Sequence, residues 1–254
     1  MILSLSADDS TDKHQPIISA GAVIGFPEDV YGVECLWRKR LDRDGIPYFR
    51  AYDCKNLAGV FDPRERGWSL NVASTIANAA YLDLVDMLRS HPEAMQVGLS
   101  MRLTEYREAI SESKEALNYW GSNHTVAIYK ALLSTVAQLL EQDWPESRQF
   151  PIACEFDIHT GFAAAEQAYC EFREIDPLVA ARFGHIGHAD DKVTPALQMA
   201  DLIAGQSREH TLDFFEGKAP AEIHERRNNI GSMYYLGIMR KEHLLKAPSL
   251  VEIQ

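Results

Sequence analysis

The first 26 residues alternate between apolar runs and a polar turn. Residues 2–7 are largely apolar, residues 17–26 form a longer apolar run, and the polar stretch 12–16 lies between them. Two such runs joined by a short polar turn are typical of a β-hairpin. We therefore predict that the chain begins with two antiparallel strands.

A third strand is predicted at residues 48–52, where aromatic residues mix with small or polar ones. This segment follows the turn signal Asp44-Gly45 and is followed by Asp53. Glycine and aspartate favour turns because they tolerate the backbone angles that a turn requires. The pattern predicts a three-stranded antiparallel meander with Asp53 at or just beyond its end.

Helical spacing of apolar positions dominates the middle of the chain. We predict helices at residues 69–90, 104–117 and 122–143, with a strand at residues 95–101 between the first two. Alternation of apolar with small or polar residues indicates the strand, and Pro92 ends the first helical pattern. The middle of the chain is thus predicted to be mainly helical.

The remaining segments alternate in type. The sequence predicts strands at residues 151–158 and 182–186, with a helix at residues 162–173 between them. Thr194 as N-cap and Pro195 at the first helical position predict the start of a final core helix.

The order of these elements predicts one domain of the α/β class. A meander followed by parallel crossovers is the order of a ribonuclease H-like mixed sheet flanked by helices. We expect this domain to span residues 1–212. Residues 213–254 are expected to form a helical and loop extension packed on the same domain.

Charge and cysteine usage narrow the function classes. The 254-residue chain has a formal net charge of −12, which argues against a general basic surface for nucleic acid. Its four cysteines lack CxxC spacing, and no run approaches the length of about 20 apolar residues that spans a bilayer. We expect a cytoplasmic protein without membrane insertion.

Nucleic acid would have to bind through a local basic patch. One candidate patch is residues 37–43, and the other combines Arg226-Arg227 with Arg240-Lys241. The competing interpretation is a solvated helix face on which these cations mix with acidic residues. Tyr234-Tyr235 could contact nucleotides or belong to the core.

Aspartates at structurally expensive positions predict a metal site. Asp8 and Asp9 close the first predicted strand, Asp157 lies at the exit of a later strand, and Asp201 lies in an apolar helix. Ionised carboxylates in such places require a compensating cation or proton. We predict that Asp8, Asp157 and Asp201 bind Mg²⁺ or Mn²⁺, with Asp53 as a fourth ligand.

Three segments resemble the domain-of-unknown-function 3800 family. Asp8-Asp9-Ser10 is similar to the Asp-Glu-Ser-Gly start of that family, with Asp9 for Glu and Thr11 for Gly. Residues 197–205, Leu-Gln-Met-Ala-Asp-Leu-Ile-Ala-Gly, resemble its Leu-Gln-x-Ala-Asp-x-x-Ala-Gly motif, and residues 49–53 resemble a third segment. The resemblance implies a ribonuclease H-like fold and metal-dependent phosphodiester cleavage, but no particular substrate.

Each predicted metal ligand could instead have a purely structural role. Asp8 and Asp9 could be turn residues, Asp157 could belong to a strand-to-helix loop, and Asp201 could pair with Arg208. Asp190-Asp191 are expected in a solvated turn, with a supporting role behind the metal ligands as the alternative.

Other chemistries find less support in the sequence. His159, His185 and His188 lack the spacing of a zinc motif, although His159 could act as a proton shuttle. No Gly-x-Ser-x-Gly elbow or phosphate-binding loop motif is present.

Two hypotheses follow from the sequence. The first is a metal-dependent nuclease or phosphodiesterase, in which the aspartate cluster holds Mg²⁺ or Mn²⁺ and activates water. The alternative is a catalytically silent ribonuclease H-like module of a bacterial defence or mobile-element system. Such a module would act through a protein partner or a second copy of the chain.

Overall fold

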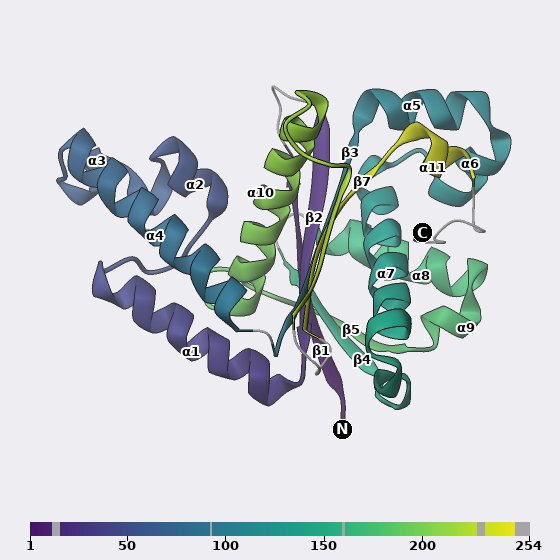
Figure 1. The fold of residues 1–254 in the computed structure, drawn as a ribbon, viewed down its shortest axis with the longest axis horizontal. Coiled ribbons are helices and arrows are strands. Elements are labelled where there is room, and N and C mark those ends of the chain that lie inside the picture. Colours follow the sequence, from purple (N-terminus) through teal and green to yellow (C-terminus); the bar gives the residue numbers. More distant parts are fainter. Residues whose placement is uncertain (12–15, 92, 159–160, 228–231, 247–254) are drawn as a thin grey trace.

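A seven-stranded mixed sheet forms the centre of the molecule. The computed structural model describes residues 1–11, 16–91, 93–158, 161–227 and 232–246. Figure 1 shows the sheet nearly edge-on, with α1 to α4 and α10 on one side and α5 to α9 and α11 on the other. The fold is therefore a three-layer α/β arrangement.

The strands of the sheet lie in the order β5-β4-β1-β2-β3-β7-β6. Their bounds are β1 Leu3–Thr11, β2 Ile17–Gly25, β3 Met95–Arg102, β4 Ile152–Asp157, β5 Phe183–Ala189, β6 Glu222–Arg227 and β7 Ser232–Met239. Strands β1, β2 and β3 form an antiparallel meander, whereas β4 and β5 continue from β1 in parallel. This arrangement confirms the predicted fold class and is consistent with a ribonuclease H-like sheet.

Helices cover both faces of the sheet. Their bounds are α1 Pro27–Arg43, α2 Ala51–Asn56, α3 Pro63–Arg66, α4 Leu70–Ser90, α5 Leu103–Glu112, α6 Lys114–Trp120, α7 His124–Asp143, α8 Phe162–Ile175, α9 Pro177–Ala180, α10 Pro195–Phe215 and α11 Lys241–Leu245, with 3₁₀ turns at Gly59–Phe61 and Pro145–Gln149. None of the helices in the described ranges is both long and apolar enough to cross a bilayer.

The predicted third strand at residues 48–52 is wrong. Phe49 and Arg50 precede a short helix, α2, that begins at Ala51, and the third strand of the meander is β3. Phe49 is fully buried, and its backbone N–H and that of Ala51 donate to side chains of α10. The aromatic residue therefore packs into a helical layer instead of a sheet.

The C-terminal segment also differs from the expected helix and loop. Residues 222–227 and 232–239 form strands, and β7 pairs in parallel with β3. Leu236 and Ile238 of β7 are buried, so this segment extends the same sheet. Its burial depends on β3, which lies more than a hundred residues earlier in the chain.

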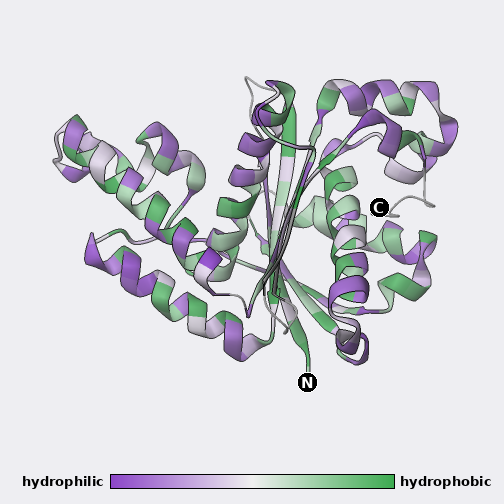
Figure 2. Ribbon diagram, in the orientation of Figure 1, coloured by the Kyte–Doolittle hydropathy of each residue, from purple (hydrophilic) through white to green (hydrophobic). Residues whose placement is uncertain are grey.

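Two hydrophobic cores lie on the two faces of the sheet. Leu3, Leu5 and Ala7 of β1 belong to the core under α7 and α8, while Val23 belongs to the core with α1, α4 and α10. In Figure 2 the central strands are largely hydrophobic, whereas the surrounding helices alternate between hydrophobic and hydrophilic residues. Because side chains alternate along a strand, the even-numbered residues of β1 point toward α10.

Candidate active site

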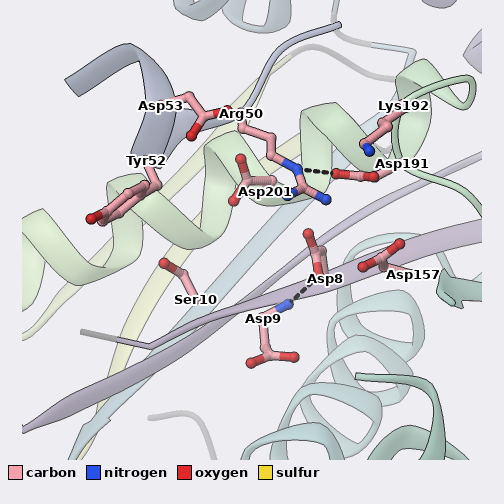
Figure 3. Close-up of a pocket in the computed structure, with 10 residues that line it drawn as sticks. All are labelled: Asp8, Asp9, Ser10, Arg50, Tyr52, Asp53, Asp157, Asp191, Lys192 and Asp201. Atoms are coloured by element: carbon pink, nitrogen blue, oxygen red, sulfur yellow. Dashed lines mark hydrogen bonds and ion pairs between the residues drawn. The ribbon is translucent and has the colours of Figure 1, made fainter. Parts of the chain in front are cut away.

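An acidic cavity of about 450 Å³ lies between the sheet and α10. Its lining comes from β1, the end of β4, the first turn of α2, the turn before α10, and α10 itself (Figure 3). The lining residues are Asp8, Asp9, Ser10, Arg50, Tyr52, Asp53, Asp157, Asp191, Lys192 and Asp201. All four aspartates predicted as metal ligands therefore border the same space.

Asp8 and Asp9 differ in orientation because they are neighbours in a strand. The structure contradicts the alternative that they are turn residues, since β1 continues to Thr11. Asp8 is buried, and its Oδ1 accepts the N–H of Asp9 at 2.8 Å. Figure 3 shows the Asp9 carboxylate pointing away from that of Asp8, and its Oδ1 accepts the Tyr129 hydroxyl at 2.8 Å.

Parallel pairing of β1 with β4 places Asp157 beside Asp8. Ala7 lies opposite Phe156 in this pairing, and each aspartate is the next residue of its strand. Asp157 is 3% exposed at the end of β4. Adjacent parallel strands thus deliver two carboxylates to the same edge of the cavity.

Asp201 reaches the cavity because α10 packs unusually close to the sheet. A β-carbon at Gly21 of β2 would lie 2.5 Å from the backbone nitrogen of Ala204, so only glycine fits under the helix there. The Oδ2 atom of Asp201 accepts the backbone N–H of Ala51 at 2.6 Å. Arg208, the partner considered in the sequence analysis, instead donates to Ser10 at 3.2 Å.

Gln198 fixes the segment that carries Arg50 against α10. Its Oε1 accepts the Phe49 N–H at 3.0 Å and the Trp37 indole N–H at 2.9 Å. Its Nε2 donates to the backbone oxygen of Asp191 at 2.7 Å. Gln198 and Asp201 lie three positions apart on α10 and therefore share a helix face. Together they hold residues 49–51 at the rim of the cavity.

Asp191 is buried, so the prediction of a solvated turn is wrong for this residue. It is 3% exposed, and its Oδ2 accepts Nε of Arg50 at 2.6 Å. Its Oδ1 is also buried and accepts no hydrogen bond from the residues that the structure describes. Asp53, predicted at a strand end, lies in the first turn of α2 and is half-buried.

Burial makes the ionised form of these carboxylates unfavourable. Burial and the charges of Asp201 and Asp9 raise the pKa of Asp8 well above its usual range. Burial raises the pKa of Asp201 to about 6, opposed by the hydrogen bond from Ala51. Burial also raises the pKa of Asp9 and of Asp53. A cation or a proton in the cavity would stabilise this cluster.

The chemistry of the donor set fits a hard divalent cation. The cavity offers carboxylate oxygens, which Mg²⁺ and Mn²⁺ prefer, and the buried Oδ1 of Asp191 lacks a described hydrogen-bond donor. Among the described residues, no three His, Cys, Asp or Glu side chains meet as a compact ligand group. The carboxylates therefore surround the cavity without converging on one point.

Other candidate residues from the sequence lie elsewhere. His185 and His188 are exposed on β5, and His159 lies outside the described residues.

In the first basic patch, Trp37 is fully buried and Arg40 pairs with Asp44 and Asp83. The side chains of Arg226 and Arg227 lie outside the described part, and Lys241 pairs with Glu108 and Glu112.

Comparison with known protein-family models and with curated proteins gave no match. The resemblance to the domain-of-unknown-function 3800 family therefore stays a prediction based on the three motifs.

Sequence reasoning missed the parts played by Arg50, Gln198 and Asp191. Gln198 carried a usable signal, because a polar amide three positions before Asp201 in an apolar helix needs hydrogen-bond partners. Arg50 lay within a motif that was noted, but its pairing with Asp191 joins residues 141 positions apart. Nothing local to the sequence indicates that pairing.

Proposed function

We propose that this chain is a metal-dependent nuclease or phosphodiesterase. The observation that carries the proposal is that buried Asp8 and Asp157 and half-buried Asp201 border one cavity, whose described lining has six aspartates and two cations. Such a cluster is unfavourable for folding unless a bound cation or a proton compensates its charge. Perturbed carboxylates in a cavity are also characteristic of active sites.

Asp8, Asp157 and Asp201 would hold Mg²⁺ or Mn²⁺, and Asp53 lies within the same lining as a further ligand. A bound divalent ion supplies positive charge that stabilises the phosphoryl transition state and acidifies water. Asp191 would act differently, because its Oδ2 holds the Arg50 guanidinium at the rim. Arg50 can then bind and orient a phosphate group.

Metal binding can be tested separately from cleavage. We would titrate Mn²⁺ into the wild-type protein and the Asp8→Asn and Asp201→Asn variants by isothermal calorimetry. Each variant should bind Mn²⁺ at least about 100-fold more weakly, since even residues behind the ligands change metal affinity 10- to 100-fold. Asp42→Asn, which alters an exposed carboxylate of α1, is the matched control.

Cleavage is then measured with labelled single-stranded and duplex RNA and DNA in Mn²⁺. The proposal predicts phosphodiester cleavage by the wild-type and Asp42→Asn proteins, and its loss in Asp8→Asn. Cleavage that persists in both Asp8→Asn and Asp201→Asn would refute the assignment of these ligands. A wild-type protein that neither binds Mn²⁺ nor cleaves would refute the function.

The second candidate is the catalytically silent binding module. Its supporting observation is that Arg50 already provides a cation beside Asp191, and that its charge opposes the rise in the pKa of Asp201 that burial causes. In that case the carboxylates would keep their positions by internal pairing alone. Mn²⁺ binding in the calorimetric titration distinguishes the two functions, because the module does not require it.

A further inference from the structure

Three of the residues that line the acidic cavity could bind the bases and phosphates of a nucleic acid. They are Tyr52, Arg50 and Lys192. We propose that they form a binding rim for single-stranded nucleic acid, in which Tyr52 stacks on a base while Arg50 and Lys192 contact phosphates. This inference rests on the proposed function and names its substrate class.

Tyr52 has the exposure and position of a stacking platform. Its side chain lies in the first turn of α2, lines the cavity, and is 61% exposed. No ring contact or side-chain hydrogen bond joins it to another described residue. An exposed aromatic ring beside a phosphodiester-cleaving site can accept any base on its face.

Arg50 presents a fixed guanidinium group to the same space. Its Nε donates to Asp191, and its side chain remains 36% exposed. The hydrogen bonds of Phe49 and Ala51 to α10 fix the backbone on both sides of it. In the described part of the chain no hydrogen bond occupies its two terminal amino groups, which can therefore bind a phosphate in a bidentate manner.

Lys192 provides a second cation that lines the cavity. Figure 3 shows Tyr52 and Lys192 on opposite sides of the lining residues, with Arg50 between them. The Lys192 ammonium lies 5.7 Å from the centre of the Tyr48 ring, close enough for a cation–π contact. A strand that contacts both Tyr52 and Lys192 would thus lie along the cavity that Asp8 and Asp201 also line.

The charge distribution favours one strand over a duplex. Duplex binding requires contacts to many phosphates, but the chain has a net charge of −12 and Arg40 and Lys241 are already paired with acids. A cavity of about 450 Å³ is of small-molecule size and suits a single unpaired nucleotide. Stacking combined with a few phosphate contacts is the usual mode of single-strand binding.

Fluorescence anisotropy tests the rim without cleavage. We would use fluorescein-labelled strands of about 12 nucleotides, as DNA and as RNA of the same sequence, and the corresponding DNA duplex. Ca²⁺, another oxygen-preferring divalent ion, replaces Mn²⁺ in the buffer. The wild-type protein should bind at least one of the single strands more tightly than the duplex. Comparison of the DNA strand with the RNA strand shows which nucleic acid is preferred.

Variants distinguish stacking from a structural effect. Tyr52→Ala should weaken single-strand binding about tenfold, while Tyr52→Phe keeps the ring and the affinity. Tyr31→Ala is the matched control, because Tyr31 is 60% exposed on α1 and does not line the cavity. Lys192→Gln and Arg50→Gln should each reduce the slope of log affinity against log salt by about one.

The inference is overturned if Tyr52→Ala binds single strands as tightly as the wild type, or if the duplex binds as well as both single strands. It also fails if no strand binds. Either of the first two results leaves the proposed function intact as long as the wild-type protein binds Mn²⁺ and cleaves. Absence of Mn²⁺ binding and cleavage, in contrast, refutes the proposed function itself.

Discussion

Two groups of carboxylates in this protein have opposite electrostatic environments. Between α1 and α4, Arg40 contacts Asp44 at 2.7 Å and Asp83 at 2.6 Å, and Arg43 contacts Asp83 at 2.9 Å. Hydrogen bonds from Arg40 and Arg43 lower the pKa of Asp83. In the cavity, burial and neighbouring negative charge raise the pKa of Asp8.

The difference shows how one residue type serves two purposes. The α1–α4 group gives each carboxylate a cation, so it contributes to packing of the two helices. Among the residues that the structure describes, six aspartates line the cavity, and the lining cations are Arg50 and Lys192. Its charge is therefore balanced only when a further cation or a proton binds, which is the behaviour expected of a functional site.

The largest expected effect is stabilisation by metal at the cavity. At a Mn²⁺ concentration about 100 times its Kd, the wild-type protein should gain about 2.7 kcal/mol in free energy of unfolding. Asp8→Asn should gain almost nothing, because one ligand and its negative charge are lost. Thermal unfolding with and without Mn²⁺ measures both. An equal gain in the two proteins would place the metal elsewhere.

The next largest effect is expected when the ion pairs between α1 and α4 are broken. Arg40→Ala should destabilise the protein by about 2 kcal/mol, since Arg40 is buried and Asp83, being 45% exposed, recovers part of its hydration. Urea unfolding with an unchanged m value measures the loss. Arg38→Ala removes an exposed cation of the same helix and should change stability by less than about 0.5 kcal/mol.

Removal of a negative charge from the cavity should stabilise the protein, whereas breaking the α1–α4 ion pairs destabilises it. In the presence of a chelator at neutral pH, Asp201→Asn should raise the free energy of unfolding by about 1 kcal/mol, because a buried unfavourable charge is lost. The asparagine oxygen can still accept the Ala51 N–H. Asp83→Asn should instead destabilise, since Arg40 loses a charged partner. Destabilisation by both variants would contradict the proposed difference between the cavity carboxylates and the paired carboxylates of the α1–α4 group.

The smallest expected effect is a difference in how the stability contributions of Asp201 and Asp83 depend on pH. Between pH 3.8 and about 6 the folded protein keeps a proton on Asp201 that the unfolded chain has released. The stability contribution of Asp201 is thus fully present below pH 3.8 and is lost as the pH rises through about 6. Asp83 behaves oppositely, because its lowered pKa contributes stability above its ordinary pKa that is lost on acidification.

This pH effect is measured by urea unfolding in chelator between about pH 5 and pH 7.5, a range that includes the raised pKa. The stability gain of Asp201→Asn over the wild type should shrink as the pH falls. A gain that stays constant over this range would show that Asp201 does not change protonation there.

Local patterns were sufficient for most elements of the α7 to α10 region. Apolar spacing predicted α7 and α8, and Pro195 marked the first residue of α10. The expected Thr194 cap makes no side-chain hydrogen bond, and Glu34 of α1 instead accepts the N–H of Ala196 at 3.2 Å. Proline restricts its own backbone, whereas a cap can be supplied from elsewhere in the fold.

Partners that are distant in the sequence also explain the wrong predictions at residues 48–52 and at the C-terminus. Phe49 has a high strand propensity, but its backbone N–H pairs with Gln198, which is 149 residues away. Strand β7 exists because β3 offers a parallel edge. Each partner lies far outside the local stretch of sequence that sets helix or strand propensity.

The sequence by itself determined the α/β class, the ribonuclease H-like order of β1, β2, β4 and β5, and the placement of carboxylates at positions that are costly to bury. These follow from periodicity and from the free energy of charge burial, which are local properties. Only the tertiary structure decided that Arg50 meets Asp191, that Asp191 is buried, and that Tyr52 borders the carboxylates. Such contacts depend on how α2 and α10 pack together, because packing brings distant residues within hydrogen-bonding distance.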